Sequence, residues 1–189
     1  EVTKNGGKCI LTEKEHLTGT DRIFEAYQKI KPSNVDYVIN LQGDEPMIDI
    51  DDIKNLNTDA IRKNSEIATL ACKIKDKNIL NKSNIVKVIT DKKISKKSMS
   101  RANAFSREIL FDYNSNIYHH VGIYIYKVST LEKFVNLKQT ENEISQKLEQ
   151  LRAIDNNISI DVALAKTSPI GVDTNEDYLA IKKLMEYNN

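Results

Sequence analysis

The apolar and polar positions of the chain follow two alternating patterns. Apolar residues recur at helical spacing over residues 18–30 and again over 49–61, which predicts two amphipathic helices, each with one buried face. Short apolar runs around these helices predict strands at 8–11, 37–41 and 67–74. A chain in which strands and helices alternate favours an α/β fold, with a parallel sheet covered by helices on both faces.

The pattern changes in the second half of the chain. Segments that alternate or run apolar, without long helices between them, predict antiparallel strands at 85–90, 94–99 and 118–128. Residues 103–117 carry few regular signals and are expected to form a loop. Helical spacing returns at 129–137, 144–156 and 175–187, and a further strand is predicted at 158–165. We therefore expect a single domain over residues 1–189, built on a mixed, mostly parallel sheet with an antiparallel insertion.

The composition narrows the function without identifying it. The 189 residues include 28 Lys and Arg against 27 Asp and Glu, so no overall charge attracts nucleic acid or an anionic membrane. No apolar stretch approaches the roughly 18 residues that a membrane-spanning helix needs, and no signal peptide opens the chain. We expect a cytoplasmic protein with no membrane insertion and no nucleic-acid partner.

The most informative segment is the end of the strand predicted at 37–41, where Gln42 and Gly43 lead into Asp44 and Glu45. In open α/β sheets, ligands bind at the edge where the strands end. Adjacent carboxylates at that edge are well placed to hold a divalent cation such as Mg²⁺, which prefers oxygen ligands. Taken alone, the dipeptide favours the alternative of two solvated acids in a turn.

A second carboxylate can reach the same edge as Asp44. Asp173 follows the strand predicted at 158–165, and two carboxylates that converge from separate strand ends suit an octahedral cation. Gly171 permits a close backbone approach just ahead of Asp173. This favours a metal ligand over the alternatives, a turn acid or the N-cap of the last helix.

Three further groups of residues are candidates for binding. Residues 18–22, Thr-Gly-Thr-Asp-Arg, open a helix whose free backbone N–H groups favour anions, unless they form an ordinary helix cap. His120 and Tyr124 lie four positions apart on a predicted strand and so share one face, either as a pocket wall or as core residues. Glu149 and Gln150 are neighbours on a predicted helix, about 100° apart, so they can flank a ligand.

Six separated blocks of sequence occur in the order found in one enzyme family. They are Leu17-Thr-Gly-Thr-Asp-Arg-Ile23, Asn40-Leu-Gln-Gly-Asp-Glu-Pro46, Ser100-Arg-Ala102, His120-Val-Gly-Ile-Tyr-Ile-Tyr126, Leu148-Glu-Gln-Leu-Arg152 and Gly171-Val-Asp-Thr-Asn-Glu-Asp177. Together they resemble 3-deoxy-manno-octulosonate cytidylyltransferase, also called CMP-Kdo synthetase, over essentially the whole chain. The resemblance implies a Rossmann-like nucleotide-diphospho-sugar transferase fold and a homodimer that uses CTP, Kdo and Mg²⁺.

The resemblance also implies a reaction and a set of site residues. The enzyme would transfer CMP from CTP to the anomeric hydroxyl of 3-deoxy-D-manno-octulosonate (Kdo), releasing pyrophosphate, for lipopolysaccharide biosynthesis. Asp44 and Asp173 are implied as catalytic residues and Mg²⁺ ligands. Arg101 is implied for the sugar carboxylate, to which a guanidinium is well matched. The implied sugar-binding residues are Gln42, Arg101, His120, Tyr124, Glu149 and Gln150, and those on the nucleotide side are Thr18, Gly19 and Arg22.

The chain departs from the family pattern at its start. The family opens with a βαβ unit that carries a basic phosphate loop, and residues 1–10 resemble the stretch after that unit. We therefore expect an N-terminally truncated member of the fold, and the activity of this chain on its own stays open. Two alternatives stay open: a cytidylyltransferase for another acidic sugar, and a non-catalytic remnant that binds sugar or nucleotide.

Overall fold

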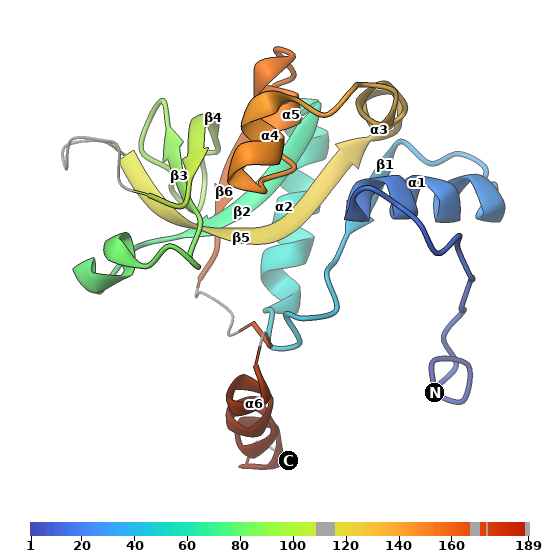
Figure 1. Ribbon diagram of the computed structural model, residues 1–189, viewed down its shortest axis with the longest axis horizontal. Coiled ribbons are helices and arrows are strands. Elements are labelled where there is room, and N and C mark those ends of the chain that lie inside the picture. Colours follow the sequence, from blue (N-terminus) through green and yellow to red (C-terminus); the bar gives the residue numbers. More distant parts are fainter. Residues whose placement is uncertain (109–115, 167–170, 173, 188–189) are drawn as a thin grey trace.

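The computed structural model describes residues 1–108, 116–166, 171–172 and 174–187, and Figure 1 shows its elements. The strands of this part form one sheet: β1 Tyr37–Asn40, β2 Ile67–Cys72, β3 Lys87–Thr90, β4 Ser100–Ser106, β5 Asn116–Lys127 and β6 Ile160–Leu164. Their order across the sheet is β1-β5-β2-β6-β4-β3, and β5 also pairs with β3. The long β5 joins the two sides of the sheet, because its first residues pair with β3 and its last with β1 and β2.

The sheet is mixed, as the sequence predicts, but its pairing differs from the expected one. Strands β1, β2, β3 and β6 share one direction, and β4 and β5 run the opposite way. Because β5 lies between β1 and β2, and β4 lies beside β6, the parallel pair among the described strands is β2 with β6. The mixed α/β architecture is confirmed. The expectation of a mostly parallel sheet is not, since the antiparallel strands enter the centre of the sheet.

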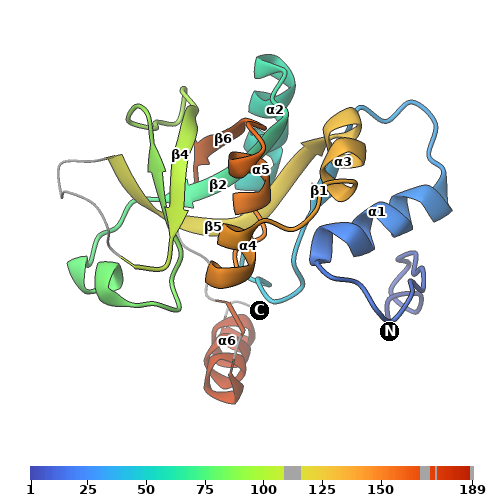
Figure 2. The ribbon, with the colours of Figure 1, turned by 45° about the horizontal axis from the view of Figure 1, so that its top comes forward.

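Helices cover both faces of the sheet. The helices of the described residues are α1 Gly19–Ile30, α2 Ile50–Lys63, α3 Val128–Val135, α4 Glu141–Gln146, α5 Leu151–Asp155 and α6 Asn175–Tyr187, with a short 3-10 helix, η1, at Lys77–Asn81. Figures 1 and 2 show α3, α4 and α5 on one face of the sheet and α2 on the other. Two apolar cores result: Leu131 and Phe134 of α3 pack in one, and Leu56 and Ala60 of α2 pack in the other.

Local signals fix the starts of the two helices that the sequence predicts most clearly. The Thr18 hydroxyl accepts from the backbone N–H of Asp21 and caps α1, and the Asp49 carboxylate accepts from the N–H of Asp51 and caps α2. Such caps satisfy N–H groups that would otherwise lack a partner in the first turn. Both helices begin within one residue of the predicted position.

Four predicted elements are wrong in whole or in part. Residues 8–11 form no strand, and Leu11 is 85% exposed with no strand beside it. In the segment 94–99 the pairing is an isolated bridge between Ser95 and Ser98, and the strand begins later, at Ser100. The helix predicted at 144–156 divides into α4 and α5. Of the loop predicted at 103–117, residues 103–106 belong to β4 and 116–117 to β5, and 109–115 lie outside the described residues.

The last helix, α6, lies apart from the sheet in Figures 1 and 2. Thr174 and Asp177 cap it reciprocally: the N–H of Asp177 donates to the Thr174 hydroxyl at 3.1 Å, and the N–H of Thr174 donates to the Asp177 carboxylate at 3.0 Å. No helix in the described part of the chain is long and apolar enough to cross a membrane.

Candidate active site

A cleft of about 930 Å³ opens beside β5, between the loop that follows β1 and the turn that joins α4 to α5. Because β1 ends at Asn40 opposite Tyr124, the loop that follows runs on along β5 toward its middle. The cleft is lined by six of the residues predicted from the sequence, namely Gln42, Asp44, His120, Tyr124, Glu149 and Gln150. The fold therefore brings together residues that lie more than a hundred positions apart in the chain.

Polar atoms without partners mark this cleft. Among the residues that the structure describes, the buried side-chain polar atoms that lack a hydrogen-bond partner are Glu45 Oε2, the Tyr124 hydroxyl and Glu149 Oε1. All three residues line the cleft. A buried polar atom left unpaired costs about 1–3 kcal/mol, so such groups call for an explanation. A hydroxylated ligand in the cleft would supply the missing partners.

The carboxyl groups of Glu45 and Glu149 sit in a poorly solvated environment. Burial raises the pKa of both, opposed by the Gly122 N–H at Glu45 and by two threonine hydroxyls at Glu149. Burial also raises the pKa of the Tyr124 hydroxyl well above its usual value, and the carboxylates of Glu149 and Glu45 act in the same direction. Both carboxyl groups therefore lie close enough to the Tyr124 hydroxyl to affect its pKa.

His120 is held neutral within the wall of the cleft. Its Nε2 lies 3.0 Å from the Thr69 hydroxyl, which is itself 2.7 Å from the carbonyl oxygen of Ile123. Since the hydroxyl donates its proton to that carbonyl, His120 must donate from Nε2, which leaves Nδ1 as an acceptor. Burial, with a smaller contribution from His119, lowers the pKa of His120 to about 3. The ring lies edge-on to Phe105 and so forms a fixed, uncharged surface.

The predicted nucleotide side adjoins this cleft. Thr18 lines a neighbouring recess of about 400 Å³, which shares Glu149 with the cleft. A Cβ atom at Gly19 would lie 3.5 Å from Nε2 of Gln42, so the start of α1 lies against the loop after β1. Arg22 points elsewhere: its guanidinium donates to Thr12 and to backbone carbonyls of residues 13 and 14. It anchors the N-terminal segment to α1 and does not line the cleft.

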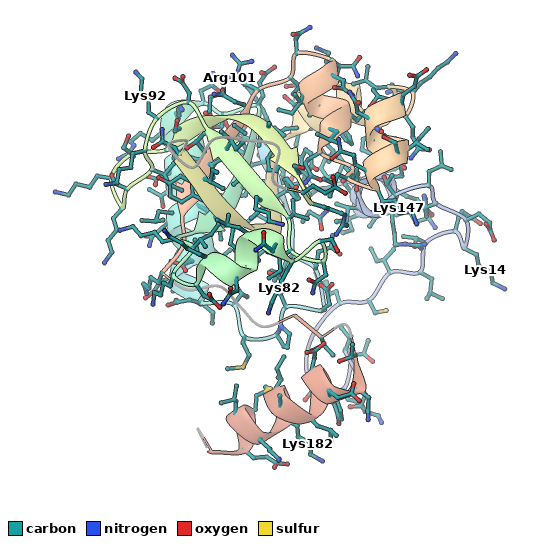
Figure 3. All side chains as sticks on the ribbon, turned by 60° about the vertical axis from the view of Figure 1, so that its left-hand side comes forward. Lys14, Lys82, Lys92, Arg101, Lys147 and Lys182 are labelled. Atoms are coloured by element: carbon teal, nitrogen blue, oxygen red, sulfur yellow. The ribbon has the colours of Figure 1, made fainter. Side chains whose placement is uncertain are left out.

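Arg101, predicted for the sugar carboxylate, does not line the cleft either. Figure 3 shows it at the end of the molecule opposite to Lys82. It lies beside Glu66 at the start of β2, where burial raises the pKa of Glu66 but hydrogen bonds from Ser159 and the charges of Lys133 and Arg101 lower it. The physical reason is the strand itself, since Arg101 lies near the beginning of β4 and the cleft lies beyond its end.

Arg107 is the guanidinium that lines the cleft. It follows the last residue of β4, Ser106, and its side chain donates to the carbonyl oxygens of Gln146 at 3.3 Å and Ser83 at 3.3 Å. The Ser-Arg-Ala motif used in the sequence analysis occurs at 100–102, whereas Ser106 and Arg107 are followed by Glu108, so that motif does not indicate Arg107.

Three cationic side chains line the cleft, namely Lys82, Arg107 and Lys147. Beneath them, Lys87 is 3% exposed, and its ammonium donates to the carbonyl oxygens of Lys82 at 2.8 Å and Arg107 at 2.5 Å. A buried lysine therefore fixes the backbone that presents two of the surface cations.

The proposed metal ligands can be compared with the structure in part. Asp44 is exposed at the mouth of the cleft, and its carbonyl oxygen accepts from the N–H of Val172 at 2.8 Å. This bond brings residues 171–172 to the loop after β1. Asp173 lies outside the described residues. Within the described ranges, no group of three or more His, Cys, Asp or Glu side chains forms a metal site.

Comparison with known proteins places the chain in a family. The cytidylyltransferase family profile matches residues 1–160. A 3-deoxy-manno-octulosonate cytidylyltransferase of Bartonella henselae is 39% identical over 185 residues, 97% of this chain and 75% of that protein. The corresponding protein of Paramagnetospirillum magneticum is 35% identical over 186 residues, 98% of this chain and 75% of that protein.

Solved structures give the same result. A CMP:2-keto-3-deoxy-manno-octonic acid synthetase complexed with CTP matches with a TM-score of 0.87 and 31% identity, covering 100% of this chain and 76% of that one. An apo UDP-glucose pyrophosphorylase matches with a TM-score of 0.65 and 13% identity, over 95% of this chain and 63% of that one, which shows a shared fold alone. The nucleotide-diphospho-sugar transferase fold is thus confirmed.

Proposed function

Because the chain belongs to the cytidylyltransferase family, and within it to the 3-deoxy-manno-octulosonate cytidylyltransferases, we propose that it transfers CMP from CTP to Kdo. The anomeric hydroxyl of the sugar attacks the α-phosphorus of CTP, and the bond from that phosphorus to the bridging oxygen breaks. Pyrophosphate leaves, the hydroxyl proton passes to solvent, and CMP-Kdo is formed. The product supplies lipopolysaccharide biosynthesis.

One observation carries the proposal beyond family membership. The buried polar atoms without partners in the described part of the chain belong to three residues of the same cleft, Glu45, Tyr124 and Glu149. Two of these atoms are carboxylate oxygens, which accept hydrogen bonds when ionised. A sugar with several hydroxyl groups satisfies such acceptors, whereas an apolar ligand does not.

Cationic side chains line the same cleft as these acceptors. Arg107, Lys82 and Lys147 present cations to the same cleft. A planar guanidinium matches a carboxylate in two parallel hydrogen bonds, so Arg107 takes the role that the sequence assigned to Arg101. A sugar acid carries both a carboxylate and hydroxyls, and the cleft offers partners for each.

The proposed function includes Mg²⁺, with Asp44 and Asp173 as its ligands. Asp44 supports this proposal, because it is an exposed carboxylate at the cleft, of the kind that Mg²⁺ prefers, and its carbonyl oxygen accepts a hydrogen bond from the N–H of Val172. When bound, the ion would neutralise charge that develops on phosphate oxygens in the transition state. The described residues contribute orientation: Gln42 and the start of α1 form the wall between the sugar cleft and the nucleotide side.

The test is pyrophosphate release by the protein with CTP, Kdo and Mg²⁺. We expect release only when all three are present, and its loss in Asp44→Asn, with Asp36→Asn, an exposed acid before β1, as the control. A panel of other acidic sugars decides between Kdo and a related substrate. If Asp44→Asn retains the full rate, the metal assignment is wrong. If the protein binds Kdo or CTP without releasing pyrophosphate, the function is binding without turnover.

Two further parts of the proposal concern the state of the protein. We propose that it acts in the cytoplasm, where its nucleotide substrate is made, and as a homodimer, as its family resemblance implies. Sedimentation of the purified protein tests the second point. A monomer at micromolar concentration would contradict the homodimer and leave the proposed reaction unaffected.

A further inference from the structure

Glu45 lines the cleft, and the family resemblance implies no role for it. Its neighbour Asp44 is exposed, whereas Glu45 turns inward and has one oxygen, Oε2, buried without a partner. The other oxygen, Oε1, accepts from the backbone N–H of Gly122 in β5 at 3.4 Å. The carboxylate is therefore held from one side, and its second oxygen lies among the residues that line the cleft.

An irregularity in β5 makes this contact possible. In the pairing with β2, Thr69 lies opposite Tyr124 and the next residue, Leu70, lies opposite Val121, so Gly122 and Ile123 have no partner in that register. A β-bulge of this kind leaves backbone groups outside the ladder and re-aims side chains, and bulges are common next to active sites. The N–H of Gly122 is thus available to Glu45.

The lack of a side chain at Gly122 also matters. A Cβ atom there would lie 3.6 Å from Oε1 of Glu45, which is ordinary contact, but any larger side chain would occupy the place of the carboxylate. The bulge is stabilised from below by Thr69, whose hydroxyl lies 3.2 Å from the carbonyl oxygen of Val121 and 2.7 Å from that of Ile123. Glu45 is accordingly placed by the backbone of the sheet.

The surroundings of Glu45 define what can bind to it. Tyr124 and Glu149 carry the other two buried atoms without partners, and all three residues line the same cleft. The two carboxylate oxygens, when ionised, can accept hydrogen bonds but cannot donate them, whereas the tyrosine hydroxyl can do both. A pair or a row of hydroxyl groups on one ligand meets all three, since each hydroxyl donates once and accepts as well.

We propose that Glu45 is a specificity-determining residue, whose Oε2 accepts a hydrogen bond from one hydroxyl of the sugar substrate. The inference rests on the proposed function and adds a residue to its sugar site. A role as a third ligand of the metal is less compatible with the geometry, because Glu45 turns inward to Gly122 while Asp44 remains exposed. As a sugar-binding residue, Glu45 should affect the Kd for Kdo, whereas as a metal ligand it should affect the dependence on Mg²⁺.

The experiment compares the wild-type protein with Glu45→Gln. In the variant, the amide oxygen can keep the contact with Gly122, and the NH₂ group then faces the cleft, so an acceptor is replaced by a donor. We expect the Kd for Kdo, measured by NMR titration, to rise about 10- to 100-fold, which is the usual size of a lost hydrogen bond to a charged group. The Kd for CTP and its dependence on Mg²⁺ should stay unchanged.

A series of deoxy analogues of the sugar identifies the hydroxyl. For the analogue that lacks the contacted hydroxyl, the wild type and Glu45→Gln should bind with the same Kd. Gly122→Val provides a second variant, because it displaces the carboxylate without changing its chemistry and should weaken sugar binding to a similar degree. Glu141→Gln, an exposed carboxylate at the start of α4, is the matched control and should bind like the wild type.

These measurements distinguish a wrong role for Glu45 from a wrong function for the protein. Wild-type affinity for Kdo in Glu45→Gln would overturn the role of Glu45 and leave the proposed function intact. Normal sugar binding with a raised requirement for Mg²⁺ would also overturn it, in favour of a metal ligand. A wild-type protein that binds no hydroxylated sugar acid would overturn both the inference and the proposed function.

Discussion

A buried ion pair supports the turn that delivers two residues to the cleft. Nε and Nη2 of Arg152 donate to the two carboxylate oxygens of Glu143 at 2.9 and 2.6 Å, and the side chains are 2% and 3% exposed. The guanidinium also lies over the ring of Phe134, 4.7 Å from its centre. The pair joins α4 to α5 across the turn that carries Glu149 and Gln150, so its loss should affect both stability and binding.

The perturbation that tests this is Arg152→Met, which keeps much of the side-chain volume and removes the charge. It leaves Glu143 buried with Gln139, whose amide donates to it at 3.1 Å, and with no cation. Removing one partner of a buried pair costs about 3–5 kcal/mol, whereas an exposed pair contributes about 0–1 kcal/mol. For a chain of this size, the larger cost corresponds to a fall in Tm of roughly 6–20 °C.

The loss of stability in Arg152→Met should become smaller as the pH falls. Burial raises the pKa of Glu143, but hydrogen bonds from Arg152 and Gln139 outweigh it, and the pKa is lowered. The contribution of the pair is therefore complete above the unfolded pKa of a glutamate, about 4.3, and is lost as the pH falls through the folded value. In Arg152→Met, protonation of Glu143 relieves the buried charge, so the deficit should narrow from pH 7.5 toward pH 4.5.

Urea unfolding followed by circular dichroism at both pH values measures the free energy of unfolding. The matched control is Arg62→Met on α2, because Arg62 also donates to a carboxylate, Asp59, at 2.7 Å but is 63% exposed. The double variant Arg152→Met/Glu143→Leu should recover much of the loss, since apolar residues often replace a buried pair at little cost. A loss below about 1 kcal/mol in Arg152→Met, equal to that of the control, would refute the reasoning.

Three further predictions concern the wall of the cleft. Lys87→Met removes the ammonium that donates to the carbonyl oxygens of Lys82 and Arg107. We expect the free energy of unfolding to fall by about 1–3 kcal/mol and the Kd for Kdo to rise. An unchanged Kd in a titration would contradict the positioning role of Lys87. Burial and a neighbouring histidine lower the pKa of His120 to about 3, so between pH 6.5 and about 3 the unfolded form binds a proton that the folded form does not. Stability should therefore fall by about 1.4 kcal/mol per pH unit over that range. His120→Gln should flatten this slope in urea titrations, and an identical slope would show that His120 is not the group. Thr69→Val leaves the carbonyls of the bulge without their hydroxyl partner, so both unfolding stability and Kdo affinity should fall, whereas a loss of stability alone would separate the bulge from the site.

The elements that the sequence predicts well are those whose signals are local. Thr18 and Asp49 cap their own helices, and the spacing of apolar residues within α1 and α2 determines which face is buried. The strand β2 is buried throughout, as a short apolar run between helices predicts. In each case the residues that decide the structure lie within one or two turns of one another, so no knowledge of the partners was needed.

The strand β4 shows what local patterns cannot supply. Its sequence, Ser-Arg-Ala-Asn-Ala-Phe-Ser from Ser100 to Ser106, contains small and polar residues that favour no strand. It is a strand because β3 and β6 both pair with it, and those partners come from distant parts of the chain. The same limit explains Arg101 and Arg107: a motif indicates a guanidinium, but the end of a strand decides which one reaches the cleft.

The prediction of one helix at 144–156 was wrong for a related reason, and the helix is interrupted within the candidate active site. Lys147 adopts a left-handed backbone with φ of 52°, and α4 ends there. Glu149 and Gln150 therefore lie in a turn, where both line the cleft, instead of pointing about 100° apart on one helix. The buried pair of Arg152 and Glu143 stabilises this turn through contacts that a helical pattern does not reveal.

The charged side chains of the cleft determine which of the two substrates needs Mg²⁺ in order to bind. Asp44, Glu45 and Glu149 line it from the loop after β1 and the α4–α5 turn, so a triphosphate that enters without a cation meets several carboxylates. Like charges at a few ångströms in a poorly solvated site repel by several kcal/mol, roughly 4 at 4 Å. A sugar acid meets no such barrier, because Arg107 and the neighbouring lysines receive its carboxylate while the buried acceptors receive its hydroxyls. We therefore expect CTP affinity, but not sugar affinity, to depend steeply on Mg²⁺, and equal dependence of the two in titrations would contradict this division of the cleft.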